Sequence, residues 1–202
     1  MDRWPSRRRD VVALAGCGLL AWLGMRGGRV PLLSMADLGF HELGHLVCYV
    51  LDAFLPWPEL VTAAAGSGFQ VGVPLGLAAY FLLAPRDRLG GALCLAWAGT
   101  AAADVARYVA DAPYQAMPLI GGQHDWASIL GPEQLDRLDD AAGWARAVDG
   151  AGWLLVAAGV VVALLPLARW LLAGDPPTGP SGSAGASGSS GPADEAAARF
   201  PV

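Results

Sequence analysis

The sequence ELVTAAAGSGFQVGVPLGLAAYFLLA, residues 59–84, has no charged side chain after its first residue. A helix of about 20 predominantly apolar residues is long enough to cross the hydrocarbon core of a bilayer. In lipid such a segment has to be helical, because a helix satisfies its own backbone hydrogen bonds without a neighbouring strand. We therefore expect a membrane-spanning helix over these residues.

Other apolar stretches lie on both sides of this segment, at residues 11–25, 31–55, 89–110 and 151–173. The breaks among the first four segments are short and rich in proline, tryptophan or arginine, which is typical of turns at a membrane surface. The whole chain is 54% hydrophobic and only 15% charged, which is too apolar for a water-soluble domain. The sequence therefore predicts an all-α integral membrane protein with about five transmembrane helices in contact with lipid.

The remaining segments are basic or polar. Residues 1–10 include Arg7-Arg8-Arg9, which fits a cytoplasmic flank or a cleaved targeting signal. We expect the flank, because too few apolar residues precede the site that resembles a cleavage site. Residues 111–150 form a polar connection in which Pro132 begins an expected interfacial helix. Residues 174–202, rich in Gly, Ser, Pro and Ala, are expected to be a disordered tail.

The net charge and the choice of basic residues indicate which partners and which kind of source organism to expect. The formal net charge of -5 argues against a nucleic-acid partner. All 13 basic residues are arginine, a bias typical of GC-rich bacterial genomes, so we expect a bacterial inner (cytoplasmic) membrane. The sequence leaves the oligomeric state open.

The second apolar stretch contains His41-Glu42-Leu43-Gly44-His45. Residues four apart share a helix face, so His41 and His45 can direct both imidazoles at one tetrahedral zinc ion. Glu42 can then act as the catalytic base, taking a proton from the attacking water and delivering it to the leaving group. If the helix enters the membrane near residue 31, the site is about 15 Å deep. Ionisable groups at that depth are rare unless they bind something, pair, or line a wet cavity.

A catalytic zinc site needs a third protein ligand and one open position. The one other histidine, His124, precedes Asp125 and Trp126 in a loop that begins with two glycines. We favour His124 as the third ligand, with Asp125 either orienting an imidazole or binding the metal instead. The alternative is a solvated loop histidine with no special role.

A polar stripe in the fourth apolar stretch provides supporting or alternative ligands. Asp104, Tyr108 and Asp111 follow helical spacing and share one face. The stripe could support the metal site, or it could form local ion pairs with Arg107 at the membrane edge.

The third apolar stretch offers one polar residue and a run of small ones. Gln70 lies near the expected depth of the metal and could contact the substrate or an oxyanion. Gly68, Gly72 and Gly76 recur every four residues, and this spacing predicts the close approach of another helix.

An HExxH sequence inside a transmembrane segment resembles the site-2-protease-like integral-membrane zinc metallopeptidases. The resemblance implies that His41 and His45 are zinc ligands and that Glu42 is the catalytic base of a peptidase. The Asn-Pro-Asp-Gly type segment of that family, which supplies an aspartate ligand, is absent here, so a metal site without peptide cleavage remains an alternative. Residues 35–130 more closely resemble an uncharacterised group of bacterial membrane proteins with HExxH and a later His-Asp-Trp.

Together these features predict a zinc-dependent intramembrane hydrolase. The leading hypothesis is a peptidase that acts on membrane-embedded or membrane-adjacent polypeptides. One alternative is a non-catalytic metal-binding protein, a sensor or scaffold, which a closed four-ligand shell would favour. The other is a small transporter subunit in which the intramembrane charges line an ion path.

Overall fold

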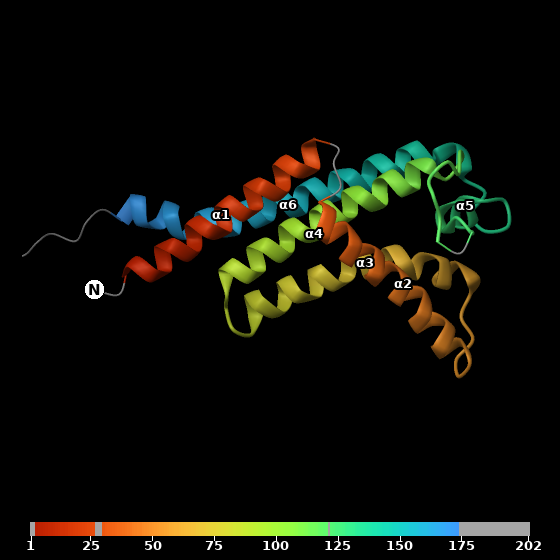
Figure 1. Cartoon of the computed structure of the whole chain (residues 1–202), viewed down its shortest axis with the longest axis horizontal. Helices are drawn as coiled ribbons and strands as arrows, with labels where there is room; N and C mark the ends of the chain where they lie inside the picture. The colour runs from red at the N-terminus through yellow and green to blue at the C-terminus, as the bar shows by residue number, and fades with distance from the viewer. Residues whose placement is uncertain (1–2, 27–29, 121, 174–202) are drawn as a thin grey trace, which may run out of the picture. The chain divides into compact units, whose positions relative to one another are not determined.

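The computed structural model describes residues 3–26, 30–120 and 122–173, and within these ranges every regular element is a helix. In chain order the elements are α1 (Arg3–Met25), α2 (Pro31–Asp52), α3 (Glu59–Leu83), α4 (Arg88–Asp111), α5 (Asp125–Leu130), the 3-10 helix η1 (Leu138–Asp140) and α6 (Ala141–Ala173) (Figure 1). The all-α class is confirmed for the described residues. The tail predicted at residues 174–202 lies outside them.

Three helical segments are long and apolar enough to cross a membrane, judged by length and composition. They are α3, α4 and Leu138–Arg169, which comprises η1 and most of α6. This finding indicates a membrane protein.

Local sequence signals set the helix boundaries. Pro31 occupies the first turn of α2, where its missing N–H is not needed. Asp87 caps α4, with its carboxylate accepting a hydrogen bond from the backbone N–H of Leu89 at 3.1 Å. The α2–α3 connection contains Pro56 and Pro58, which cannot continue a helix.

The polar connection before α6 differs from the expectation. The interfacial helix expected from Pro132 is absent: residues 132–135 form turns, and α6 begins at Ala141 and continues to Ala173. The expected span at residues 151–173 is therefore the second part of one longer helix. Ala141 and Ala145 are buried against residues of α4 and α5, and this packing explains why the helix extends through the polar segment.

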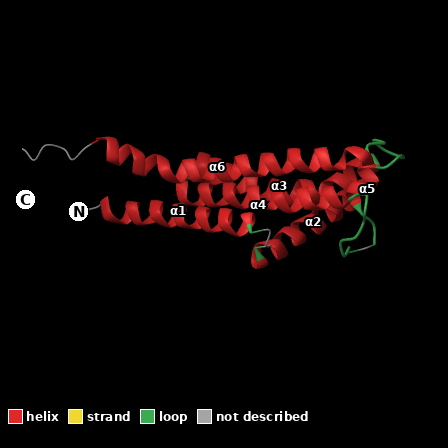
Figure 2. Ribbon diagram, turned by 90° about the horizontal axis from the view of Figure 1, so that it is seen from above, coloured by secondary structure: helices red, strands yellow, loops and turns green. Residues whose placement is uncertain are grey.

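α4 packs against α1, α3 and α6 (Figures 1 and 2). Its buried side chains are mostly alanines, which let neighbouring helices approach closely. Gly99 of α4 faces the backbone of Gly152 in α6, and a Cβ at either position would overlap the other helix. Small residues in α4 therefore allow it to pack closely against its neighbouring helices.

The close contact between α2 and α3 lies at a different set of small residues from the one expected. A Cβ added to Gly68, Gly72 or Gly76 would meet nothing within 4 Å, so no described helix packs on that face. Gly44 of α2 instead lies directly against the carbonyl of Ala65 in α3. This crossing places the HExxH motif against the N-terminal half of α3.

Candidate metal centre

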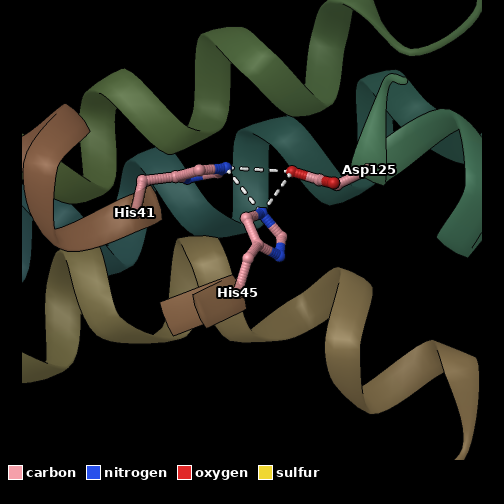
Figure 3. Close-up of side chains that lie close together, drawn as sticks. All are labelled: His41, His45 and Asp125. Carbon is pink, nitrogen blue, oxygen red and sulfur yellow. Dashed lines mark hydrogen bonds and ion pairs between the residues drawn. The ribbon is translucent and has the colours of Figure 1, made fainter. Parts of the chain in front are cut away.

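Two histidines and an aspartate from distant parts of the chain meet at one point. His41 and His45 project from α2, and Asp125 is the first residue of α5 (Figure 3). His41 Nε2 lies 2.9 Å from Asp125 Oδ2 and 3.2 Å from His45 Nε2, and His45 Nε2 lies 3.2 Å from the same oxygen. The donors of a tetrahedral zinc ion lie about 3.4 Å apart, so an outward shift of a few tenths of an ångström would let these three hold a metal ion.

The second ring nitrogen of His45 has a partner that fixes its tautomer. His45 Nδ1 lies 2.9 Å from the carbonyl oxygen of Thr62. A carbonyl oxygen can only accept, so Nδ1 carries the proton and the Nε2 of the neutral ring presents a lone pair to the cluster. An N–H donated to a backbone carbonyl is the usual arrangement of a histidine that binds metal.

His41 is oriented in the same way by Gln70. His41 Nδ1 lies 3.3 Å from Gln70 Oε1, while the amide nitrogen of Gln70 donates to the carbonyl of Ala101 at 3.5 Å. In their neutral forms, both imidazoles therefore direct the Nε2 lone pair at the Asp125 carboxylate. Lone pairs that converge in this way repel one another, and either a metal ion or a proton between the donors would relieve the repulsion.

Gln70 makes contacts within the protein that the sequence did not predict. Both ends of its amide are engaged inside the helix bundle, with His41 and with Ala101, and the side chain is buried. Gln70 thereby orients His41, which is a candidate metal ligand. The side chain also lines the cavity that leads to the three donors.

A glycine of α3 faces the cluster. An ideal Cβ on Gly66 would lie 2.5 Å from His45 Nε2 and 2.6 Å from His41 Nε2. These distances approach the length of a zinc–nitrogen bond, about 2.0–2.1 Å, so the space that a side chain would fill is the space into which both rings point. The sequence signal for this residue is weak, because Gly66 lies beside a longer run of glycines.

Tyr108 holds Asp125 in place. Its hydroxyl accepts a hydrogen bond from the Asp125 backbone N–H at 3.0 Å and lies 3.3 Å from Asp125 Oδ2. Its ring stacks on His124 with the centroids 4.2 Å apart. The next residue, Trp126, donates from its indole to Ser67 of α3 at 3.0 Å. The start of α5 is therefore attached to both α3 and α4.

His124 does not join the three donors, in contrast to the sequence-based expectation. Its Nδ1 accepts a hydrogen bond from Ala127 N at 3.2 Å, which caps α5. In the neutral ring the proton is then on Nε2, which lies 3.4 Å from Asp111 Oδ2 rather than in the cluster. Burial lowers the pKa of His124 against the opposing effect of Asp111, which favours this neutral form. A ring that caps a helix through one nitrogen and carries its proton on the other has no lone pair for a metal.

The remaining residues of the predicted stripe have separate roles. Asp104 pairs with Arg107 and accepts from the hydroxyl of Ser34 at 3.3 Å. The Asp111 carboxylate accepts from the backbone N–H groups of Ala116 and Met117 at 3.2 and 2.9 Å. Neither aspartate belongs to the group of three candidate metal donors. Of the two roles expected for Asp104, the structure shows the local ion pair with Arg107.

Asp37 is a buried polar residue whose role is not evident from the sequence. It is 2% exposed and accepts a hydrogen bond from the indole of Trp97 at 2.8 Å. Together with the bond between Ser34 and Asp104, this contact connects α2 to α4. Asp37 therefore helps to hold the helix that carries both histidines.

An open cavity of about 340 Å³ leads to the three donors. Glu42, Gln70 and Tyr108 line it together with His41, His45 and Asp125. Tyr108 is three residues from the end of α4, so the donors lie nearer the end of this helix than its middle. Glu42 thus borders the same space as the metal donors.

The number and type of the donors indicate which metal ions the site could hold. Within the described ranges the cluster consists of three His and Asp side chains, which leaves at least one position of a tetrahedral ion without a protein ligand. Two histidines and one carboxylate with an open position are typical of catalytic zinc, and the same donors also hold Fe(II) in non-haem oxygenases. The site can therefore hold a divalent ion that is open to the cavity.

No protein-family model, curated protein or solved structure matches this chain. The resemblance to the site-2-protease-like metallopeptidases therefore rests on the motif residues themselves.

Proposed function

We propose that this chain is a membrane-embedded, zinc-dependent hydrolase, in which His41, His45 and Asp125 hold the metal. The observation that carries the proposal is the convergence of these three donors on a cavity that Glu42 also lines. A closed structural site would need a fourth protein ligand, and the described part of the cluster has none. This argues for catalysis over a sensor or scaffold role.

Zinc, when bound, would polarise a carbonyl group and make water a stronger nucleophile at neutral pH. Glu42 would take the proton of the attacking water and return it to the leaving group. Gln70 and Thr62 would keep the proton of each imidazole on Nδ1, and Tyr108 would keep Asp125 at the donor position.

The expected reaction is cleavage of a peptide bond in a polypeptide in or beside the membrane. The support for this part is the resemblance of residues 41–45 to the site-2-protease-like family. We further propose that α1 and α2 cross the membrane with α3, α4 and α6, and that this membrane is a bacterial inner membrane.

Glu42→Gln in proteoliposomes tests the catalytic assignment. A peptide library is incubated with the protein, and cleavage products are identified by mass spectrometry. We expect cleavage by the wild type, a loss of at least about 100-fold in the variant, which lies within the usual contribution of a general base, and unchanged bound zinc.

Glu59→Gln is the matched control, because Glu59 is exposed at the start of α3 and lies outside the metal cavity. It should cleave as the wild type does. Full activity of Glu42→Gln would remove Glu42 from the mechanism. Absence of any zinc-dependent cleavage by the wild type would contradict the hydrolase proposal.

A further inference from the structure

An apolar wall borders the metal donors. It consists of Leu38 and Tyr49 from α2 and of Met117, Pro118, Leu119 and Ile120 from the loop after α4, and all six line the cavity that contains His41, His45 and Asp125. Polar groups form the part of the cavity nearest the donors. The cavity therefore has two chemically different regions.

The wall residues on α2 flank the glutamate of the motif. Leu38 precedes Glu42 by four residues and Tyr49 follows it by seven, so all three lie along one helix face. Leu38 is 45% exposed and Tyr49 is 65% exposed. A ligand whose reacting bond lies next to Glu42 would therefore have Leu38 on one side and Tyr49 on the other along α2.

The loop part of the wall is fixed at one end. The Asp111 carboxylate accepts hydrogen bonds from Ala116 N and Met117 N, at the point where the wall begins. Further along, Ile120 is 63% exposed. The loop thus presents an apolar surface on an anchored backbone.

The charges around the donors balance once a divalent ion is bound. The carboxylates of Asp125, Glu42 and Asp104 carry three negative charges, and the ion and Arg107, which pairs with Asp104, carry three positive ones. A phosphoester or carboxylate would add uncompensated negative charge in this space, whereas an amide or ester would not. The cavity is therefore suited to an uncharged acyl group.

We propose that this wall is a subsite for a bulky apolar group next to the acyl group that reaches the metal donors. The ligand class is thus an uncharged amide or ester that carries a branched aliphatic or similar side chain beside the reacting carbonyl. This inference deepens the proposed function and rests on it for the reaction. The preference for an apolar side chain depends on the bound metal and on the wall residues, and it does not require that the protein hydrolyses the ligand.

The test measures the binding of three small chelators to the purified, zinc-loaded full chain in lipid nanodiscs. The probes are the hydroxamates of N-acetyl-leucine, N-acetyl-glycine and N-acetyl-aspartate, which share the metal-binding group and differ in the side chain. We expect the leucine compound to bind about tenfold tighter than the glycine compound, because burying an isobutyl group favours binding by at least that factor. The aspartate compound should bind most weakly. Equal affinities for the leucine and glycine compounds would overturn the subsite.

Two wall variants and one control assign the preference to named residues. Ile120→Asp and Leu38→Ala should each reduce the ratio of leucine to glycine affinity by at least threefold, and both positions are exposed enough to tolerate the change. Tyr114→Asp is the control: Tyr114 is 78% exposed in the same connection and does not line the cavity. It should leave the ratio unchanged. An unchanged ratio in both wall variants would overturn the proposal.

The outcomes separate the subsite from the reaction. A leucine preference that depends on Ile120 and Leu38, without Glu42-dependent cleavage, would support the subsite and contradict the proposed function. Glu42-dependent cleavage with no leucine preference would support the function and overturn the subsite. A failure of zinc-loaded protein to bind any of the three hydroxamates would overturn the subsite as well.

Discussion

His45 Nδ1 lies 2.9 Å from the carbonyl oxygen of Thr62, on the neighbouring helix α3. A candidate metal ligand of α2 is thus oriented by the backbone of the helix that α2 crosses. Gly44 brings the two helices close enough for this contact, since it lies against the carbonyl of Ala65. The geometry of the metal centre therefore depends on the α2–α3 crossing as much as on the HExxH sequence.

Gly66→Ala should remove the metal and leave the fold intact. The added methyl group would lie 2.5 Å from His45 Nε2 and 2.6 Å from His41 Nε2, in the space that the ion needs. Alanine favours a helix by up to about 1 kcal/mol over glycine, which offsets part of the cost of moving the two rings, so the metal-free protein should still unfold cooperatively on heating. Zinc content by atomic emission spectrometry is the readout.

Gly68→Ala is the control for that experiment, because a Cβ at Gly68 meets nothing within 4 Å. It should bind zinc with wild-type stoichiometry. Stoichiometric zinc in Gly66→Ala would mean that the ion does not occupy the space between the two rings.

Gln70→Leu should weaken zinc binding by about 10–100-fold, the usual effect of removing a residue that orients a metal-binding histidine. The substitution removes the acceptor for His41 Nδ1 and leaves the three donors in place. Zinc affinity is measured by competition with a chelator. The matched control is Gln134→Leu, at an exposed turn outside the metal cavity. A wild-type affinity for Gln70→Leu would exclude the proposed positioning role.

Tyr108→Phe should lower zinc affinity by a smaller factor, about three- to tenfold. The ring remains, but the backbone N–H of Asp125 loses its acceptor and the carboxylate loses a partner, at a cost of about 1 kcal/mol. Tyr114→Phe, at an exposed position, should have no effect. If both variants bind zinc equally well, the Tyr108 hydroxyl does not position Asp125.

Asp37→Ala should lower the free energy of unfolding by about 1–3 kcal/mol, because the indole N–H of Trp97 would be left without its acceptor at 2.8 Å. Asp37→Asn keeps an acceptor oxygen and should lose less. Denaturant titration in detergent measures both. Equal stability of the two variants and the wild type would show that the Asp37–Trp97 contact does not hold α2 against α4.

Helices α3 and α4 and two of the three donors could be predicted from the sequence because each depends on local spacing. Apolar segments of sufficient length predict α3 and α4, and the four-residue spacing of His41 and His45 predicts their shared face. The third donor could not be predicted in the same way, because Asp125 reaches the site through the long connection after α4. Choosing between His124 and Asp125 requires knowing which of them caps α5, and that depends on the backbone geometry at Ala127.

Two further features of the fold could not be predicted from sequence patterns. The spacing of Gly68, Gly72 and Gly76 predicts that another helix packs on this face of α3. Instead α2 packs on α3 at Ala65 and Gly66, because Gly44 of α2 lies directly against these two residues. Pro132 and the helical spacing of the apolar residues after it predict a separate helix, yet burial of Ala141 against its neighbours makes the segment from Ala141 onward part of α6.

The most direct test of the metal centre is the zinc and iron content of the purified full chain, compared among the wild type, Asp125→Ala and His124→Ala. The three-donor cluster predicts about one zinc per wild-type chain, little or none in Asp125→Ala, and near wild-type content in His124→Ala. A metal-free wild type, or a metal that is lost in His124→Ala and kept in Asp125→Ala, would contradict the assignment of His41, His45 and Asp125 as the ligands.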